Sequence, residues 1–284
     1  MTDDPVETLA EQLSERFGAK RADADSTGPL EAWQLIAGRG SCRHFTGEKV
    51  DADLLQTLCA LALCAPSKSD LQQRDIVLVQ DPDVRSAINA LLTAGPLAQA
   101  WIADAPHLLV FCGNNRRQRQ IHEWRGRPFV NDHLDAFFNA AVDAGIAMTT
   151  FIHAAEAAGL GCCPISAIRN HAGRVSELLR LPDHVFPVAG LGLGWPKFPP
   201  RITMRLPLDA TVHVDKFTDD DVREHIEGYD RARNAHRPIT AQRDIDRYGE
   251  DPAYGWSEDK ARQYAKPERE TFGDFVRNKG FKLD

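Results

Sequence analysis

The sequence predicts a domain of the α+β or mixed α/β class, in which a small sheet is flanked by helices. Four short runs rich in apolar residues, at 75–80, 106–112, 162–165 and 185–193, have the length and composition of buried strands. Around them, apolar residues recur every three or four positions, as on one face of a helix. Strands that alternate with helices pack as a sheet covered by helical layers.

Composition limits the classes of function. The 284 residues suffice for one large domain or two small ones, and 43% are hydrophobic, so a core needs no disulfides. Net charge is −7 with scattered Lys and Arg, which favours neither nucleic acid nor an anionic membrane as partner. We expect no signal peptide and no membrane span, because no basic region precedes an apolar core and no apolar run is long enough. The six cysteines form no C-x-x-C pair, which predicts buried, reduced thiols and a cytoplasmic location.

The first elements in order are helices. Residues 5–17 have a helical spacing of apolar positions, and Gly18 is expected to end that helix. The polar residues 18–28 read as a linker, so residues 1–28 are interpreted as an extension outside the main domain. A short helix is expected at 30–37.

Capping residues mark the next two helices. Asp51 is expected to cap a helix that runs to Cys64 and is stopped by Pro66. Pro82 begins another that runs to Leu92. The first of these has an expected buried stripe, formed by Leu54, Leu55, Leu58 and Leu61.

The longest helical pattern lies in the middle of the chain. Residues 114–127 come before it, are polar and basic, and are expected to form a mobile flap or short helix over a pocket, or a surface excursion. Residues 132–158 then form one long helix ended by Gly159, followed by a short helix at 175–179. Small residues in the long helix allow close approach, so we expect it to be central or at a dimer interface. These residues are Ala140, Ala141, Ala144, Gly145 and Ala147.

The last segment, 219–284, is charged and helical in pattern. Its aromatic residues predict that it packs back on the protein and is not disordered. The expected anchors are Trp256, Tyr264, Phe272, Phe275 and Phe281.

Residues 37–45 place two guanidiniums around a hydroxyl. Arg39 and Arg43 are forked, permanently charged donors, Ser41 adds a hydroxyl, and Gly40 lets a ligand approach the backbone. This set matches a phosphate monoester. It equally fits a solvated charge pair at a basic helix end.

A second motif follows. Residues 65–73 form a polar loop that ends in side-chain amides before a strand-like run. The R-x-S-x-R-x-F motif followed by A-P-S-x-x-x-x-Q resembles the start of the FMN site in the nitroreductase family of flavin-dependent oxidoreductases. The resemblance continues through residues 159–170, 192–196 and 201–207, covering about 30–217 and, more weakly, the tail.

The resemblance implies a fold and a domain organisation. The fold is α+β and nitroreductase-like, with a central mixed, mainly antiparallel sheet flanked by helices and a C-terminal helical extension. The implied assembly is a homodimer in which each FMN site is built from two chains. The expected divisions are an N-terminal extension at 1–28, the FMN-binding domain at 29–217, and an extension at 218–284 that packs on the domain or the partner.

The resemblance also assigns the phosphate site. Arg39, Ser41 and Arg43, with Gly40 between them, hold the phosphate and ribityl end of FMN. A further position implied for Arg43 is beside the pyrimidine edge of the flavin, where its charge would stabilise the anionic reduced form. The family's closing phosphate-binding arginine matches Arg205. At Thr203 some members carry lysine, and Arg201 is a candidate to replace that charge.

Two further segments match the parts of the site around the flavin ring. Ser67, Ser69 and Gln72 match the second FMN segment, where the Gln72 amide can donate and accept at the O2–N3 edge. Many members have asparagine at Asp70, so its role is open, and it is a candidate cap for the following segment. The stretch beside the ring corresponds to Pro164, Ile165, Ser166 and Ala167, with the backbone N–H near Ser166 as donor to N5. Ser166-Ala167 replaces the Gly-Gly of some members.

Other motifs are set aside. Residues 190–194 read G-x-G-x-G inside an apolar strand, without the spacing or following helix of a dinucleotide-binding fold. The histidines have no metal-ligand spacing with the cysteines, and there is no G-x-S-x-G nucleophile motif.

The implied activity is FMN-dependent oxidation of NAD(P)H, with NADPH favoured, and reduction of a small-molecule acceptor such as a nitroaromatic, quinone or flavin. Alternatives are other flavin chemistry on the same fold, such as a dehalogenase or dehydrogenase, or a flavin-binding protein without turnover. Tail residues 254–258 and 272–281 resemble the larger NADPH-preferring members. Arg231, Arg233 and Arg237 lie just before them and are candidates for the NADPH 2′-phosphate, or a solvated helix face.

Overall fold

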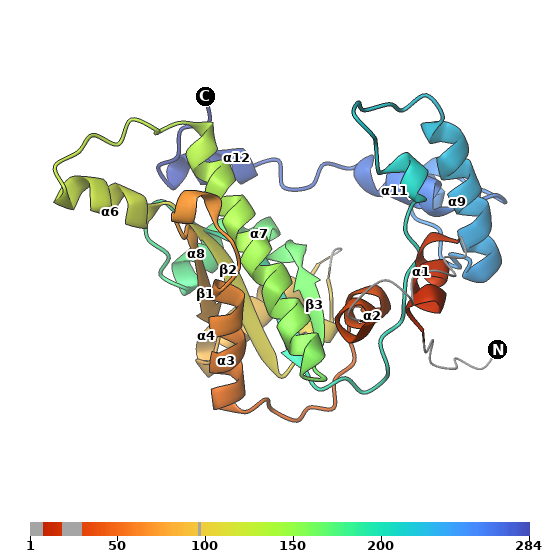
Figure 1. Cartoon of the computed structure of the whole chain (residues 1–284), viewed down its shortest axis with the longest axis horizontal. Helices are drawn as coiled ribbons and strands as arrows, with labels where there is room; N and C mark the ends of the chain where they lie inside the picture. Colours follow the sequence, from red (N-terminus) through yellow and green to blue (C-terminus); the bar gives the residue numbers. More distant parts are fainter. Residues whose placement is uncertain (1–7, 19–29, 96–97) are drawn as a thin grey trace. The chain divides into compact units, whose positions relative to one another are not determined.

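The computed structural model describes residues 8–18, 30–95 and 98–284, which form two compact units (Figure 1). We call Gly40–Pro200 with Arg269–Asp284 the sheet unit, and Met1–Arg39 with Arg201–Glu268 the helical unit. Residues 5–7 of the first expected helix and 19–28 of the expected linker lie outside the described residues.

The sheet unit is built on four strands in the order β1-β2-β4-β3. They are β1 (Arg74–Leu78), β2 (His107–Asn114), β3 (Gly161–Ile165) and β4 (Val185–Gly194). Each of the three pairings between described strands is antiparallel. The four strands match the four apolar runs of the sequence within two residues at each end. The antiparallel pairings confirm the expected, mainly antiparallel sheet.

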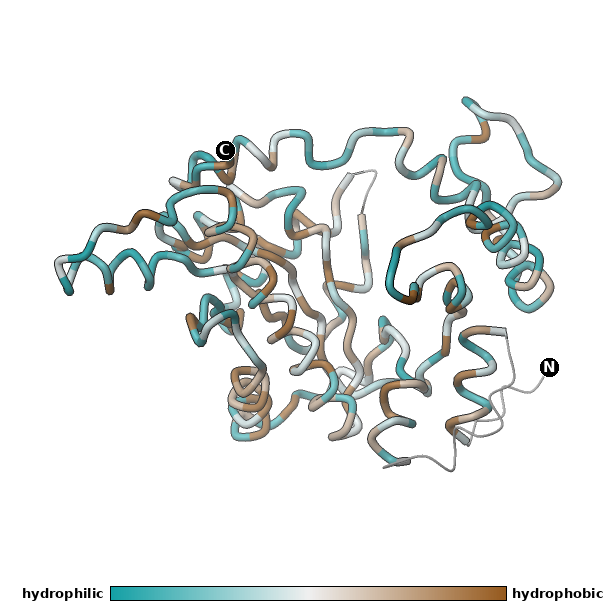
Figure 2. The backbone as a smooth tube through the Cα atoms, turned by 45° about the horizontal axis from the view of Figure 1, so that its top comes forward, coloured by the Kyte–Doolittle hydropathy of each residue, from teal (hydrophilic) through white to brown (hydrophobic). Residues whose placement is uncertain are grey.

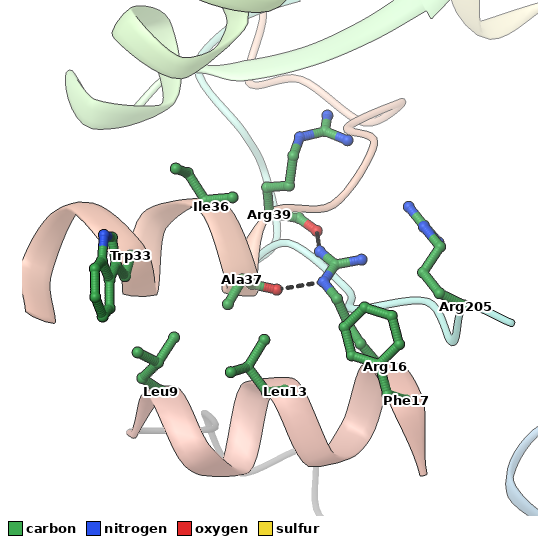
Figure 3. Close-up of a pocket in the computed structure, with 9 residues that line it drawn as sticks. All are labelled: Leu9, Leu13, Arg16, Phe17, Trp33, Ile36, Ala37, Arg39 and Arg205. Atoms are coloured by element: carbon green, nitrogen blue, oxygen red, sulfur yellow. Dashed lines mark hydrogen bonds between the residues drawn. The ribbon is translucent and has the colours of Figure 1, made fainter. Parts of the chain in front are cut away.

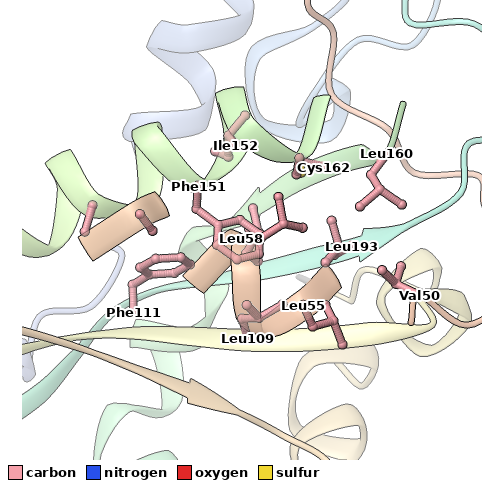
Figure 4. Close-up of a cluster of buried hydrophobic side chains, with 14 residues drawn as sticks. Val50, Leu55, Leu58, Leu109, Phe111, Phe151, Ile152, Leu160, Cys162 and Leu193 are labelled. Atoms are coloured by element: carbon pink, nitrogen blue, oxygen red, sulfur yellow. The ribbon is translucent and has the colours of Figure 1, made fainter. Parts of the chain in front are cut away.

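Alternation along the strands gives the sheet two apolar faces. Leu109, Phe111, Leu191 and Leu193 point to one face, which α3 (Ala52–Leu63) and α7 (Leu134–Ala157) cover (Figure 4). Leu108, Val110 and Ile165 point to the other, which α4 (Pro82–Thr93), α5 (Trp101–Asp104) and α8 (Ala172–Leu178) cover. Figure 2 shows long hydrophobic stretches in the sheet unit, whereas hydrophilic residues predominate in the protruding α6 segment at the left.

The cap expected at Asp51 and the helix start expected at Pro82 are both confirmed. The Asp51 carboxylate accepts the N–H groups of Asp53 and Leu54 at 2.9 and 3.2 Å, and Asp81 caps α4 in the same way. The stripe expected on α3 is wrong at Leu61, which is 45% exposed. The buried positions are Leu55, Leu58 and Ala62. Ala62 lies seven residues after Leu55, which is close to two full helical turns, so it shares the face of Leu55, whereas Leu61, six residues after Leu55, does not.

The small residues of α7 face inward. Ala140, Ala144 and Ala147 are fully buried, and α7 packs on the sheet and on α3. A Cβ added at Gly113 of β2 would lie 3.1 Å from the Ala140 carbonyl carbon, so the small residues bring helix and sheet together. The central position expected for α7 is confirmed. Ala140, Ala144 and Ala147 therefore offer no surface to a partner chain, whereas Ala141 and Gly145 are partly exposed. The dimer interface expected on this helix stays a prediction.

A third cluster ties the end of the chain to the sheet unit. Phe281 lies 5.3 Å from Phe186 and 5.7 Å from Phe137 between ring centroids, and Phe272 and Phe275 of α12 (Phe272–Asn278) join them. These three tail anchors are confirmed. Tyr264 is 71% exposed, so its expected anchoring role is wrong.

The helical unit contains α1 (Leu9–Phe17), α2 (Leu30–Gly38), α9 (Val222–His236), α10 (Ile245–Tyr248) and α11 (Trp256–Tyr264). Thr8 and Glu11 form a capping box at the start of α1, and Gly18 ends it with a φ of 69°. Trp256 packs on Tyr229, with ring centroids 5.3 Å apart. Both residues belong to the segment 219–284, so this contact does not test whether Trp256 anchors the segment to the rest of the protein.

The six cysteines are free thiols. Cys112, Cys162 and Cys163 are buried, and burial raises the pKa of the Cys112 thiol to about 12. Cys64 is exposed at the end of α3, so the expectation of buried thiols fails there. In the ranges that the structure covers, every helix is too short or too polar to cross a bilayer.

Candidate functional site

The predicted site residues fall into three groups. The first lies in the helical unit and contains Arg39, Thr203 and Arg205. The second lies along the outer edge of β3 and contains Gly40, Ser41, Arg43 and residues 164–167. The third is the loop before β1 with Ser67, Ser69 and Gln72.

In the first group, two guanidiniums extend to the same side, away from α1 (Figure 3). Arg39 follows α2, and Arg205 lies in the extended segment after Arg201. The Nη1 atom of Arg205 donates to the carbonyl and hydroxyl oxygens of Thr203 at 3.0 and 2.6 Å. Both arginines line a cavity of about 500 Å³ with residues of α1 and α2. The structure therefore brings together two of the predicted phosphate-binding arginines.

Arg16 of α1 holds both segments in place. Its buried guanidinium donates to the carbonyl oxygens of Ala37 at 2.5 Å and Thr203 at 3.3 Å, and also to that of Arg39. Its own carbonyl accepts the N–H of Arg205 at 2.6 Å. No motif in the sequence predicts this role for Arg16. The one indication in the sequence is that Arg16, a charged residue, follows Leu9 by seven residues and therefore lies on the same apolar side of α1.

In the second group, the chain runs along the outer edge of β3. The Cys42 N–H donates to the Cys162 carbonyl at 2.9 Å. The Arg43 guanidinium lies 5.8 Å from the centroid of the Trp101 ring. Trp101 packs on Gly192, where an added Cβ would lie 2.8 Å from a ring carbon. The glycines of β4 thus make room for packed side chains, which explains the G-x-G-x-G pattern without a nucleotide.

Residues 164–167, at the end of β3, alternate between exposed and buried side chains. The side chains of Ile165 and Ala167 lie in the core, whereas Pro164 and Ser166 are exposed. Ile165 and Ala167 can therefore offer only backbone groups to a ligand. Ser41 and Arg43 are exposed, and Gly40 is buried.

In the third group, the backbone of the loop is strained. Ser69, Asp70 and Gln72 have φ values of 50°, 55° and 52°, the left-handed region that non-glycine residues rarely adopt. The Gln72 N–H donates to Ser67 Oγ at 3.1 Å, so the Ser67 hydroxyl stabilises the fold of the loop. Gln72 Nε2 donates to Asp70 Oδ1 at 3.1 Å. Asp70 thus orients the Gln72 amide, and the cap expected from it is replaced by this contact.

The basic segment after β2 holds the same loop. Within residues 114–127 the chain forms the short helix α6 (Arg116–Trp124), which is one of the alternatives expected from the sequence. The pocket expected beneath it stays a prediction. Arg117 Nη1 donates to the Gln72 carbonyl at 2.7 Å, and Gln118 Nε2 donates to the Leu71 carbonyl at 2.6 Å. Arg117 also pairs with Asp75 at 2.6 Å. Sequence reasoning missed these contacts.

The second and third groups lie on opposite edges of the sheet. β3 and β1 are its two edge strands, and two strands separate them. At roughly 4.8 Å per strand, the edges are about 14 Å apart. Within one protomer, residues 164–167 and the 67–72 loop thus belong to opposite edges of the sheet.

Comparison with known proteins defines the family. Residues 36–195 match the model described as the nitroreductase family, and residues 204–284 match its C-terminal domain. The chain belongs to the nitroreductase family. An FMN reductase [NAD(P)H] of Bacillus subtilis is 31% identical over 259 residues, spanning 89% of this chain and 99% of the relative. An oxygen-insensitive NADPH nitroreductase of Salmonella typhimurium is 36% identical over 184 residues, 65% of this chain and 73% of the relative.

A solved structure agrees with this assignment. NfrA2 of B. megaterium superimposes with a TM-score of 0.79 at 32% identity, covering 90% of this chain and all of that one. The nitroreductase fold expected from the resemblance is thereby confirmed.

Proposed function

We propose that this nitroreductase is an FMN-dependent oxidoreductase that oxidises NAD(P)H, with NADPH favoured, and reduces a nitroaromatic, quinone or flavin. The observation that carries the proposal is the Arg39–Arg205 pair, which Arg16 fixes from one side. Family membership and the relatives' names support the same activity.

The residues present fit FMN. A phosphate monoester is a dianion, and two guanidiniums on one side supply charge-assisted donors for it. The exposed Gln72 amide has its Nε2 engaged by Asp70, which leaves Oε1 to accept from an N–H such as that at flavin N3. Neither group requires movement of a buried side chain.

FMN, when bound, supplies the electron-transfer chemistry. In our proposal Arg39 and Arg205 bind its phosphate, with Thr203 orienting Arg205 through the 2.6 Å hydrogen bond. Ser41 binds the ribityl chain, and Gly40 gives close access to it. Arg43 places a positive charge near the pyrimidine edge and favours the reduced, anionic form.

The third group and the β3 segment complete the proposed site. Ser67 shapes the loop, and Ser69 and Gln72 bind the polar edge of the ring. The backbone beside Ser166, framed by Pro164, Ile165 and Ala167, donates an N–H at N5. No side chain needs to act as an acid or base in this scheme.

We propose a homodimer in which two chains build each FMN site. The support is the separation of the two segments on opposite sheet edges, together with an exposed apolar stripe on α7. Leu134, Phe138 and Val142 lie four residues apart on that helix and are 48%, 59% and 41% exposed.

Light scattering should give the mass of a dimer. Phe138→Glu should shift the equilibrium toward monomer, since it places a charge in an apolar contact, and it should lose FMN with the dimer. Phe198→Glu, at a 58% exposed position of the sheet unit outside α7, is the matched control. A wild-type monomer that keeps FMN and turns over would contradict the proposed assembly.

We also propose a cytoplasmic location, supported by six free thiols. The division into an extension at 1–28, an FMN-binding domain at 29–217 and an extension at 218–284 stays a prediction.

The proposed activity has a direct test. The purified protein should be yellow with about one FMN per chain, and anaerobic NADPH should bleach it rapidly. A panel of acceptors under steady-state kinetics then identifies the second substrate class. Bound flavin without bleaching would instead indicate a flavin-binding protein.

We propose that the basic residues at the end of α9 bind the NADPH 2′-phosphate. Arg231 and Arg237 are exposed, whereas Arg233 is partly buried and its Nη1 atom is fully covered, so its expected exposure is wrong. The double change Arg231→Gln and Arg237→Gln should raise KM for NADPH and leave KM for NADH and the FMN content nearly unchanged. Equal movement of both KM values, or of neither, would mean that the pair is surface charge.

A further inference from the structure

A single buried carboxylate holds both ends of the strained loop before β1. Asp143, in the middle of α7, is 1% exposed. Its Oδ1 accepts the Lys68 N–H at 3.1 Å, and its Oδ2 accepts the Gln73 N–H at 3.0 Å. These two N–H groups bracket residues 68–73. One side chain therefore fixes the span of the turn.

A buried arginine completes the anchor. Arg74 is 5% exposed, and its Nη1 lies 3.9 Å from Asp143 Oδ2. Its Nη2 donates to the carbonyl oxygens of Leu63 and Ala65 at 2.9 and 2.8 Å. Arg74 thus joins the carboxylate to the end of α3, where the chain enters the loop. Buried charges persist only when paired, so the two residues act as one unit.

The loop that Asp143 and Arg74 hold has a strained backbone. Three of the residues between the two ends, Ser69, Asp70 and Gln72, are in the left-handed region. Such conformations cost free energy and persist only where surrounding contacts enforce them. Arg117 and Gln118 of α6 hold the middle of the loop through the Gln72 and Leu71 carbonyl oxygens, but they do not fix its two ends. Without the anchor, we expect the turn to relax toward ordinary φ values and the Ser69 and Gln72 side chains to change direction.

We propose that Asp143 is a positioning residue for the flavin ring, acting with Arg74 to hold residues 68–73 in the conformation that presents Ser69 and Gln72. This inference rests on the proposed flavin function. It adds to that function a pair of residues that touch no ligand and act through the loop.

The test is a comparison of two flavins. Asp143→Asn keeps the shape but turns one acceptor into a donor that faces a backbone N–H. The dissociation constants of FMN and riboflavin should both rise, by the same factor of about ten or more. Riboflavin lacks the phosphate, so an equal loss assigns the defect to the ring side. The Lys68 and Gln73 amides should also lose protection from hydrogen exchange.

Asp259→Asn is the matched control. Asp259 is 6% exposed in the helical unit and accepts from Tyr254 and Arg243 at 2.9 and 3.0 Å. It should lower the melting temperature without changing either dissociation constant. Equal effects of the two variants on flavin binding, or wild-type binding by Asp143→Asn, would overturn the inference.

Arg74→Lys gives the second variant if Asp143→Asn does not fold. Lysine keeps the charge but cannot reach both carbonyl oxygens, so both dissociation constants should rise together by a factor of about three or more. Unchanged constants would overturn the inference in this arm as well. If the unmodified protein binds neither flavin, the proposed function is wrong, and the inference that rests on it is wrong as well.

Discussion

Replacing Arg39 by alanine should weaken FMN binding by roughly 1.5–3 kcal/mol, the range for a hydrogen bond to a charged group. The backbone of this segment is held independently of the Arg39 side chain, because Arg16 donates to the carbonyl oxygens of Ala37 and Arg39. The substitution therefore removes a guanidinium without removing the scaffold. Fluorescence titration of the apoprotein with FMN measures the loss.

Two comparisons separate this effect from a general one. Riboflavin affinity should stay nearly the same, because riboflavin has no phosphate for Arg39 to bind. Arg223→Ala removes a guanidinium that is 90% exposed and pairs with Glu227 at 2.9 Å in the same unit, and it should leave both affinities alone. Unchanged FMN affinity in Arg39→Ala would remove the phosphate assignment.

Local patterns predicted the elements well, because their causes are local. The cap of α3 depends on Asp51 and its next three residues, and the buried strand β2 on an unbroken apolar run. The motif at residues 37–45 was likewise readable, since its donors follow one another closely. The face of α7 was not, because whether Ala140 meets the sheet or another chain depends on what packs there.

The residues that organise the site were missed because their partners are distant in sequence. Asp143 bonds to residues 75 and 70 positions away, and Arg16 to one 187 positions away. In the sequence each is only a charge within a helical pattern. A charged residue at an expected buried position is the one signal available, and it identifies the residue without identifying its partners.

Arg16→Met should be the most damaging change in the helical unit. Methionine fills similar space but donates nothing, so the carbonyl oxygens of Ala37, Arg39 and Thr203 each lose the Arg16 donor. Only the hydrogen bond to Ala37 is buried, and the Thr203 carbonyl keeps Arg205 Nη1 as a donor at 3.0 Å. Leaving a buried acceptor unsatisfied costs about 1–3 kcal/mol, so we expect a loss of roughly 2 kcal/mol or more in the free energy of unfolding.

The same change should loosen both phosphate-binding segments, because Arg16 contacts the chain beside Arg39 and beside Arg205. FMN affinity should fall at least tenfold, and more than riboflavin affinity, which distinguishes this variant from Asp143→Asn. Arg16→Lys should lie between, since one ammonium keeps the charge but cannot reach all three carbonyl oxygens. Thermal unfolding and flavin titration measure the two effects, and a methionine variant with wild-type FMN affinity would show that the two arginines need no support from α1.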